Sequence, residues 1–364
     1  MDPILQKLIA IPSVCGDLTA AHEIISFSTE YLQARGMQVR QFVEKGFPSL
    51  VATTRRTTRP KVMLAAHLDV TPAPPELFTL RLEQGKYYGR GVFDMKFAAA
   101  CYLQVVDALQ HRLEEFDFGI MLTTDEELYG PYGTGMLVQK GFLPKVCVLP
   151  DGGTDWHIET LAKGRWFVEV AVRGTTAHGS RPWEGDSASL KLLNLLHEMQ
   201  TLFTDAQQPH THTMNVGVLK SGAMVNQVPD HAVASIDFRF VTQEDMQQIR
   251  ERLTVLCERY DATITPLTDE APPIVNSLEN PYIAAFANCI TEVTGIVPEG
   301  FFSYATSDAR YFMQAGIPCV VTSPSGGSRH ADTEWLDATS YEQFKPILLS
   351  YLQAIAAKSA RKTH

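Results

Sequence analysis

Three apolar runs in this chain, each short enough to be a buried strand, end directly at a histidine or an acidic residue. Residues 62–66 lead into His67, residues 120–124 lead into Asp125-Glu126-Glu127, and residues 146–150 lead into Asp151. In open α/β sheets, ligands bind in the crevice beyond the carboxyl ends of the strands. The pattern therefore predicts a sheet whose edge gathers imidazole and carboxylate groups, which favours a metal site over a solvated surface.

Length and composition indicate a globular protein of two domains. The chain has 364 residues, which is more than one hydrophobic core usually holds. Hydrophobic residues make up 45% and charged residues 20%, as in ordinary soluble domains. The formal net charge of −10 argues against nucleic acid as a partner, because phosphate binding needs clustered Lys and Arg.

The sequence predicts neither a membrane segment nor a disulfide framework. It has no run of 18 apolar residues, and the stretch from Met1 to Lys7 is charged at once, unlike a secretory signal. The six cysteines are scattered and form no Cys-x-x-Cys pair. This usage favours a reducing compartment, so we expect a cytoplasmic protein.

Residues 1–163 alternate between helix and strand patterns, which predicts an α/β fold with a mixed, mostly parallel sheet covered by helices. The expected helices are 18–34 and 96–113, and the expected strands are 38–43, 50–54, 62–67 and 118–124.

A different pattern follows in residues 164–273. Its order is β-α-β-β-α-β, which is typical of a ferredoxin-like α+β layer. The expected elements are strands 166–172, 213–219, 233–240 and 262–267 and helices 187–201 and 243–260. We therefore expect an inserted domain, 164–273, and a discontinuous catalytic domain made of 1–163 and 274–364.

The acidic and imidazole residues are donors that zinc prefers, and catalytic zinc sites keep one position open for water. A lone histidine is more often a hydrogen-bonded structural residue, but that alternative must be invoked separately at each strand end. Asp69 follows His67 by two residues, so it could orient the imidazole. Asp94 stands in a glycine-rich turn and could bridge two metals. Of Glu126 and Glu127, one could bind metal while the other acts as a base. His210-x-His212 is a weaker metal candidate.

Four blocks in this order resemble one family, the co-catalytic di-zinc amidohydrolases and exopeptidases. The blocks are His67-Leu68-Asp69-Val70-x-Pro72, Gly89-Arg90-Gly91-x-x-Asp94-Met95-Lys96, Asp125-Glu126-Glu127 and His330-x-x-x-Glu334. The family includes acetylornithine deacetylase, succinyl-diaminopimelate desuccinylase, carboxypeptidase G, aminoacylase and tripeptidase T. The resemblance covers essentially the whole chain and implies a zinc-exopeptidase-like fold with an inserted lid.

The resemblance also implies a role for each residue of the site. Two divalent ions, zinc or else cobalt or manganese, would be bridged by Asp94. His67 and Asp151 would complete one metal site, and Glu127 and His330 the other. Glu126 would be the general base, with Asp69 behind His67.

Further residues are expected to contact the substrate. The resemblance implies that His178 reaches the substrate carbonyl, in dimeric members from the neighbouring subunit, and that Asn226 matches a residue of the lid. Arg239 matches a position that binds a substrate carboxylate, although a strand arginine paired with an acid is an equally good interpretation. Gly326 could offer a backbone amide. We expect a homodimer formed through the inserted domain, with no nucleic acid and no membrane as partners.

The substrate class rests on Asp151, where the deacetylases and carboxypeptidases of this family carry glutamate and the tripeptidases and dipeptidases carry aspartate. A shorter ligand leaves room near the amino side of the substrate, which favours an aminopeptidase or dipeptidase acting on small peptides. Hydrolysis of N-acyl amino acids is the alternative, and a non-catalytic metal-binding relative is a further one. A serine hydrolase lacks support because no Gly-x-Ser-x-Gly elbow is present.

Overall fold

The computed structural model describes residues 1–203, 210–268 and 270–357, and the chain divides into two compact units. The larger unit comprises Met1–Leu161, Val275–Ser303 and the chain from Ser307 onward. The smaller unit comprises Ala162–Ile274 and Tyr304–Thr306. Each unit has its own hydrophobic core, and each is described by itself.

The central sheet of the larger unit has the order β1-β2-β6-β3-β7-β15. The β3 strand is parallel to β6 and β7, and β7 is parallel to β15, whereas β1, β2 and β6 pair antiparallel. This confirms a mixed, largely parallel sheet. The strands are β1 (Gln38–Glu44), β2 (Phe47–Thr53), β3 (Val62–His67), β6 (Phe118–Thr123), β7 (Val146–Val148) and β15 (Cys319–Val320).

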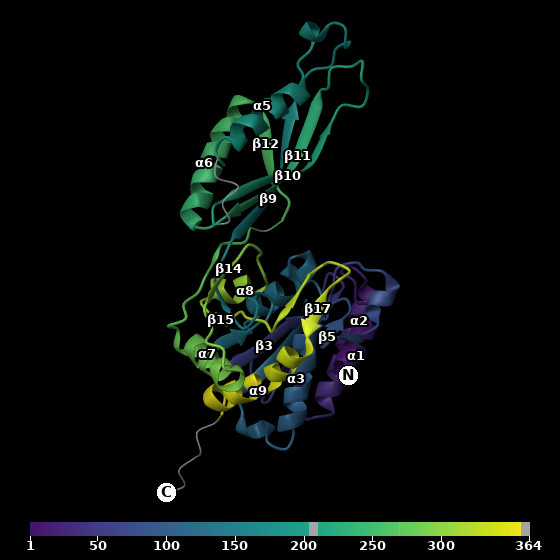
Figure 1. Cartoon of the computed structure of the whole chain (residues 1–364). Helices are drawn as coiled ribbons and strands as arrows, with labels where there is room; N and C mark the ends of the chain where they lie inside the picture. Colours follow the sequence, from purple (N-terminus) through teal and green to yellow (C-terminus); the bar gives the residue numbers. More distant parts are fainter. Residues whose placement is uncertain (204–209, 269, 358–364) are drawn as a thin grey trace. The chain divides into compact units, whose positions relative to one another are not determined.

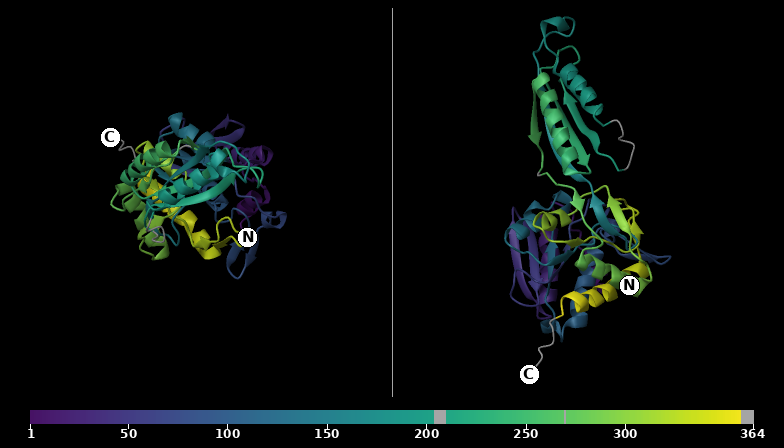
Figure 2. Two further views of the ribbon diagram at one scale, coloured as in Figure 1. Left: turned by 90° about the horizontal axis from the view of Figure 1, so that it is seen from above. Right: turned by 90° about the vertical axis from the view of Figure 1, so that its left-hand side faces the viewer.

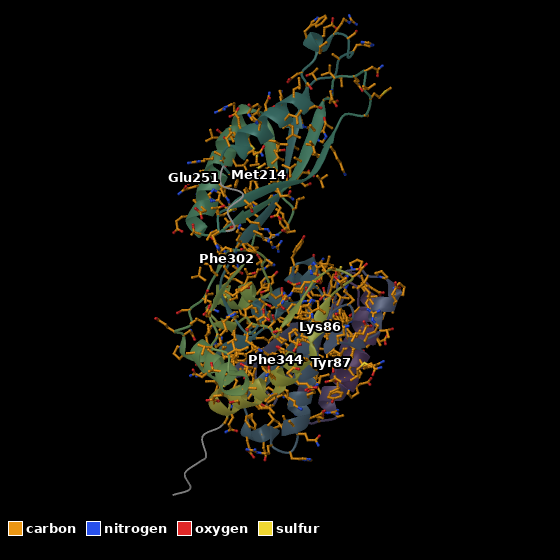
Figure 3. The ribbon with its side chains drawn as sticks, viewed as in Figure 1. Lys86, Tyr87, Met214, Glu251, Phe302 and Phe344 are labelled. Carbon is orange, nitrogen blue, oxygen red and sulfur yellow. The ribbon has the colours of Figure 1, made fainter. Side chains whose placement is uncertain are left out.

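Continuous burial explains why the inner strands read as apolar runs. Every residue of β3 and β6 is buried, as expected for parallel strands covered on both faces. The helices of this unit are α1 (Pro3–Ala10), α2 (Leu18–Gln33), α3 (Lys96–Leu109), α4 (Met136–Gln139), α7 (Pro281–Thr294), α8 (Ala309–Gln314) and α9 (Ala338–Ile355). Figure 1 shows α3, α7 and α9 packed together, and Figure 3 labels Phe344 of α9, which packs against Phe97 and Tyr102 of α3.

Helix starts follow local chemistry. Asp17 accepts hydrogen bonds from the amides of Thr19 and Ala20, so α2 begins at Leu18 as predicted. The helix expected over residues 96–113 ends earlier, at Leu109, and a separate 3₁₀ turn spans Leu113–Glu115. No side chain caps α3 at its start, and the peptide bond that precedes it, between Asp94 and Met95, is cis.

Two small sheets lie mostly in the larger unit, apart from Ala162 and Ile274 at the boundary. One has the order β13-β8-β14 and the other β16-β17-β5-β4, which carries the loop to His330. Their strands are β4 (Arg81–Glu83), β5 (Lys86–Tyr88), β8 (Ile158–Ala162), β13 (Ile274–Val275), β14 (Gly300–Ser303), β16 (Gly326–Gly327) and β17 (Trp335–Asp337).

The smaller unit has the order β-α-β-β-α-β in the chain. Its antiparallel sheet has the order β10-β11-β9-β12, the strand arrangement of a ferredoxin-like layer. Figure 2 shows α5 and α6 side by side, and both helices pack on this sheet. The elements are β9 (Gly164–Arg173), α5 (Ala188–Gln200), β10 (Thr213–Ser221), β11 (His231–Phe240), α6 (Gln243–Arg259) and β12 (Ala262–Pro266). Among the described residues, no helix has the length and apolar character of a membrane span.

Candidate metal centre

Three of the predicted donors stand at the same edge of the central sheet. His67 is the last residue of β3, Glu126 lies three residues beyond the end of β6, and Asp151 lies three residues beyond β7. These strands are neighbours in the order β6-β3-β7 and run parallel. Their carboxyl ends therefore meet, as the sequence pattern predicted.

Asp94 lies between the two histidines. Its Oδ1 is 3.2 Å from Nε2 of His67, and its Oδ2 is 3.0 Å from Nε2 of His330. Asp94 comes from the turn before α3, and His330 comes from the loop between β16 and β17. One carboxylate thus contacts imidazoles from two distant parts of the chain.

Within the residues that the structure describes, two groups of three donors could each hold a metal ion. One is His67, Glu126 and Asp151, and the other is Asp94, Glu127 and His330, with donor atoms within 4.8 Å of one another. The second group contains the set expected for one metal. The first group includes Glu126, which was expected to act as the base, and its Oε2 lies 3.9 Å from Nε2 of His67.

Asp69 orders the loop that carries the two glutamates. Its Oδ1 accepts a hydrogen bond from the amide of Glu126 at 3.2 Å, and its Oδ2 accepts one from the amide of Glu127 at 2.9 Å. The Nδ1 atom of His67 lies 2.9 Å from the backbone oxygen of Asp69 and 3.5 Å from its Oδ1. Asp69 therefore contacts the histidine, as expected, and also fixes Glu126 and Glu127, which the sequence did not indicate.

A buried ion pair that the sequence analysis did not single out joins the Asp94 turn to the His330 loop. Glu334 accepts hydrogen bonds from the amides of Gly91, Phe93 and Asp94 at 2.8–3.0 Å. Arg90 donates to Glu334 and to the carbonyl oxygen of His330, at 3.0 and 3.1 Å. Both residues belong to the motif blocks that resemble the family, but nothing in the sequence indicated that they form a pair.

Burial and crowding shift the protonation of the cluster. Burial is the main reason that the pKa of Glu127 rises to about 7 and that of Asp151 to about 6, and Asp94 raises both further. Burial and the charge of Asp151 also raise the pKa of Glu126 well above its ordinary value. Burial opposes ionisation of Asp94, but Arg329, His330 and His67 outweigh it and hold the pKa of Asp94 low.

These donors fit a pair of divalent cations. Imidazole nitrogen and carboxylate oxygen are zinc ligands, and the carboxylates here are crowded enough to raise one another's pKa. A divalent cation would stabilise the ionised form of such a set of carboxylates.

The positively charged guanidinium of Arg329 also lies at this edge of the sheet. Its Nη1 donates to Oδ1 of Asp151 at 2.9 Å, and its guanidinium lies 4.8 Å from the centre of the Phe93 ring. Its Nη2 is covered and has no hydrogen-bond partner in the described part of the chain. No sequence pattern indicated a role for this arginine, and its only signal was its position next to His330.

Comparison with known proteins decides the family. The model of the Peptidase family M20/M25/M40 matches residues 63–355, which include every residue of the candidate centre. The chain belongs to the Peptidase family M20/M25/M40. This family M20/M25/M40 protein is therefore a metallohydrolase that acts on amide or peptide bonds, which confirms the resemblance seen in the sequence.

Relatives of this family M20/M25/M40 member carry several names. The chain is 24% identical to succinyl-diaminopimelate desuccinylase of Sulfurovum sp. (strain NBC37-1), covering 96% of this chain and 98% of that one. It is 28% identical to aminoacylase-1 of Sus scrofa, covering 83% and 82%. A tripeptidase from Staphylococcus aureus has the same fold, with a TM-score of 0.79, 19% identity and 96% of each chain covered.

The smaller unit of this M20/M25/M40 protein brings two expected substrate residues close together. The backbone of His178 pairs with Gln227, and the amide of Gly179 donates to the carbonyl oxygen of Asn226 at 2.7 Å. The Nδ1 atom of His178 lies 2.8 Å from Oγ of Ser180. His178 and Asn226 therefore stand on adjoining loops of one unit.

Arg239 forms the ion pair that was weighed against a substrate role. Its Nε and Nη2 donate to the two carboxylate oxygens of Asp237, at 2.7 and 3.1 Å. The two residues stand at i and i+2 of β11, so they share one face of the strand. This bidentate pair occupies the guanidinium in the described structure.

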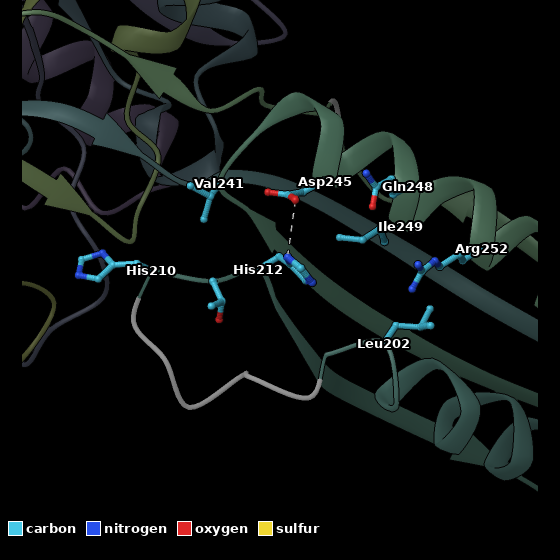
Figure 4. Close-up of a pocket in the computed structure, with 9 residues that line it drawn as sticks. Leu202, His210, His212, Val241, Asp245, Gln248, Ile249 and Arg252 are labelled. Carbon is cyan, nitrogen blue, oxygen red and sulfur yellow. Dashed lines mark ion pairs between the residues drawn. The ribbon is translucent and has the colours of Figure 1, made fainter.

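Gly326 and the His210-x-His212 sequence were also expected as candidate site residues, and the structure shows what surrounds each of them. Gly326 pairs with Leu336 in β16, and a Cβ placed on it would lie 2.3 Å from Cδ2 of Phe93. Figure 4 shows His210 and His212 at a cavity of about 500 Å³ in the smaller unit, where His212 lies 4.0 Å from Asp245. Neither histidine belongs to the two donor groups found in the described chain.

Proposed function

We propose that this protein hydrolyses the amide bond of a small N-acyl amino acid at a centre of two divalent ions, with zinc as the metal. One observation carries the proposal of two ions: the two oxygens of Asp94 lie against His67 and His330, at 3.2 and 3.0 Å. His67 and Asp151 would complete one ion's ligands, and Glu127 and His330 the other's. Asp94 would contribute a ligand to each ion.

The bound ions would supply an activated water and polarise the scissile carbonyl. Glu126 is placed within the His67 group, and burial raises its pKa, which makes its carboxylate a stronger base than an exposed glutamate. It then returns that proton to the leaving nitrogen. Asp69 holds Glu126 and Glu127 through their amides, so the base keeps its position during this exchange.

The substrate class follows from what stands beside Asp151. The short side chain of Asp151 favoured a free-amine peptide, because it leaves room for a substrate ammonium. Arg329 donates to Asp151 in that region, and its positive charge would repel an ammonium group. The sequence relatives named desuccinylase and aminoacylase support the N-acyl class as well. Small peptides remain the second candidate, favoured by the aspartate itself.

A hydrolysis panel tests this choice. The metal-loaded protein is assayed with N-acetyl and N-succinyl amino acids and with free-amine dipeptides and tripeptides, each with zinc, cobalt or manganese added. We expect cleavage of N-acyl substrates and little cleavage of free-amine peptides. Cleavage of the peptides alone would restore the interpretation drawn from Asp151. A purified protein that binds no divalent metal would contradict the proposed centre.

We further propose that the protein is a homodimer formed through the smaller unit. Among the described strands, β10 is at the edge of its sheet and pairs with β11 alone. Val218 and Leu219 of this strand are exposed, as are Leu190 and Leu193 of the adjoining α5. An unpaired strand edge beside exposed apolar side chains favours pairing with another copy.

The oligomeric state tests this. Light scattering after size exclusion should give a dimer mass for the wild-type chain and a monomer mass for Leu193→Glu. Val255→Glu, at another exposed position on α6, is the matched control and should stay dimeric. A monomeric wild-type chain would remove the proposal. The substrate roles of His178, Asn226, Arg239 and Gly326, and a cytoplasmic location, remain predictions.

A further inference from the structure

The guanidinium of Arg329 stands at the metal centre with donor capacity that the protein leaves unused. It makes one side-chain hydrogen bond, from Nη1 to Asp151, while the covered Nη2 has no partner in the described residues. An unpaired buried donor costs free energy, so such a group needs an explanation. The side chain of Arg329 is 28% exposed whereas that of Asp151 is 8% exposed, so the arginine is the accessible member of the pair.

The surrounding charges also leave Arg329 available for an anion. Two divalent ions would balance the four carboxylates of the two donor groups. Glu159 is another buried carboxyl near Arg329, and burial raises its pKa to about 8, which disfavours its charged form. The one carboxylate that Arg329 contacts by a hydrogen bond among the described residues is Asp151, which the metal would share.

Arg239, the other candidate for binding a substrate carboxylate, is already paired with an acidic side chain. Arg239 uses both nitrogens of its fork on the carboxylate of Asp237. A substrate carboxylate would have to displace that bidentate partner. Arg329 would need no such exchange, because Nη2 makes no hydrogen bond with the described residues and needs only a shift of the partly exposed side chain to be uncovered.

We propose that Arg329 binds a carboxylate of the substrate and thereby selects amides that carry a carboxylate a few bonds from the scissile bond. This deepens the proposed function and rests on it. Guanidinium groups bind carboxylates through charge-assisted hydrogen bonds, and Arg329 is held in place by Asp151 and by the ring of Phe93. The carboxylate could be the α-carboxylate of the leaving amino acid or the terminal carboxylate of a dicarboxylic acyl group.

Matched substrates separate these two sources. An N-acetyl amino acid is compared with its C-terminal amide, which lacks the α-carboxylate. An N-succinyl amino acid is compared with its methyl succinyl ester, which lacks the acyl carboxylate. The metal-loaded wild-type protein should prefer the member with the carboxylate in one of the two pairs, and that pair identifies the source.

Arg329→Met should remove this preference. We expect kcat/KM for the carboxylate substrate to fall by at least about 30-fold, mainly through KM, since a buried charge pair loses one partner. Its uncharged analogue should change much less, so the ratio between the two falls towards one. Arg329→Lys should retain part of the preference. Arg112→Met, at an exposed pair with Glu115, is the control and should leave the ratio unchanged.

A role confined to holding Asp151 gives a different result. In that case Arg329→Met lowers the metal content and reduces both members of a substrate pair by the same factor, which would overturn the proposal. Calorimetry of the N-acyl amino acid against the metal-loaded protein gives a second readout that needs no turnover. Binding should weaken in Arg329→Met, and unchanged binding contradicts the inference. Failure of the wild-type protein to cleave any amide concerns the proposed function, whereas this binding comparison still tests Arg329.

Discussion

Glu334 and Arg90 form a buried ion pair at 3.0 Å, with both side chains only 2% exposed, although neither is a metal donor. The pair joins segments that are 244 residues apart in the chain. Glu334 also accepts from three amides of the turn that ends at Asp94. The position of Asp94, a proposed metal ligand, therefore depends on a contact behind it.

Glu334→Gln should destabilise the fold and weaken metal binding together. The glutamine keeps the size of the side chain but removes the counter-charge of Arg90, and breaking a buried pair costs about 3 kcal/mol. Denaturant unfolding and a metal titration measure the two effects. The double variant Arg90→Met/Glu334→Met should recover part of the stability, because no charge is then left unpaired. An equal loss in Glu334→Gln and in the double variant would contradict the argument.

Gly326→Ala should disturb the centre through Phe93. The added Cβ would lie 2.3 Å from the ring, and Phe93 contacts the guanidinium of Arg329 and donates its amide to Glu334. We expect a loss of about 1–3 kcal/mol in unfolding free energy, as overpacked cores show. Gly217→Ala in β10, where the nearest atoms are 3.8 Å or more away, is the control and should change little. A Gly326→Ala protein of unchanged stability would favour a purely substrate-facing glycine.

Glu126→Gln separates a base from a ligand. If Glu126 moves the proton, the variant should bind both metal ions and lose about 10²–10⁴-fold in kcat. Glu127→Gln should instead lose metal from the group it shares with Asp94 and His330. Metal analysis of both purified variants checks this. Loss of metal from Glu126→Gln would assign that residue to the His67 and Asp151 group as a ligand.

Glu159 should make the stability of the metal-free protein depend on pH. Burial raises the pKa of Glu159 to about 8, so between pH 4.5 and 8 the folded chain holds a proton that the unfolded chain has lost. Stability therefore falls as pH rises through this window and levels off above about 8. Glu159→Gln mimics the neutral form, so its melting temperature should gain on the wild type as pH rises from 5 to 9.

The control for this pH series is Glu83→Gln, at an exposed position in β4. Its melting temperature should follow that of the wild type at every pH. A Glu159→Gln difference that stays constant from pH 5 to 9 would mean that Glu159 does not titrate in this range.

The sequence alone predicted the fold class and the set of donors. Apolar runs that end at His67, at Asp125-Glu126-Glu127 and at Asp151 indicated three of the donor positions, because parallel strands bring their carboxyl ends to one edge whatever lies between them. Asp94 and His330 came from the resemblance to the family. The smaller unit's order of strands and helices was also readable, since its periodicities are local. The pair of Arg239 and Asp237 was foreseeable for the same reason, because residues two apart in a strand share a face.

Tertiary structure decided what surrounds those donors. The partnership of Arg90 with Glu334 and that of Arg329 with Asp151 cross 244 and 178 residues of chain. No periodicity or spacing encodes such contacts, because they arise when loops from separate strands meet at the sheet edge. Asp151 suggested room for a substrate amine, and the structure places the guanidinium of Arg329 2.9 Å from its carboxylate. The donors could thus be predicted from the sequence, but the position of the Arg329 guanidinium beside them depended on tertiary packing.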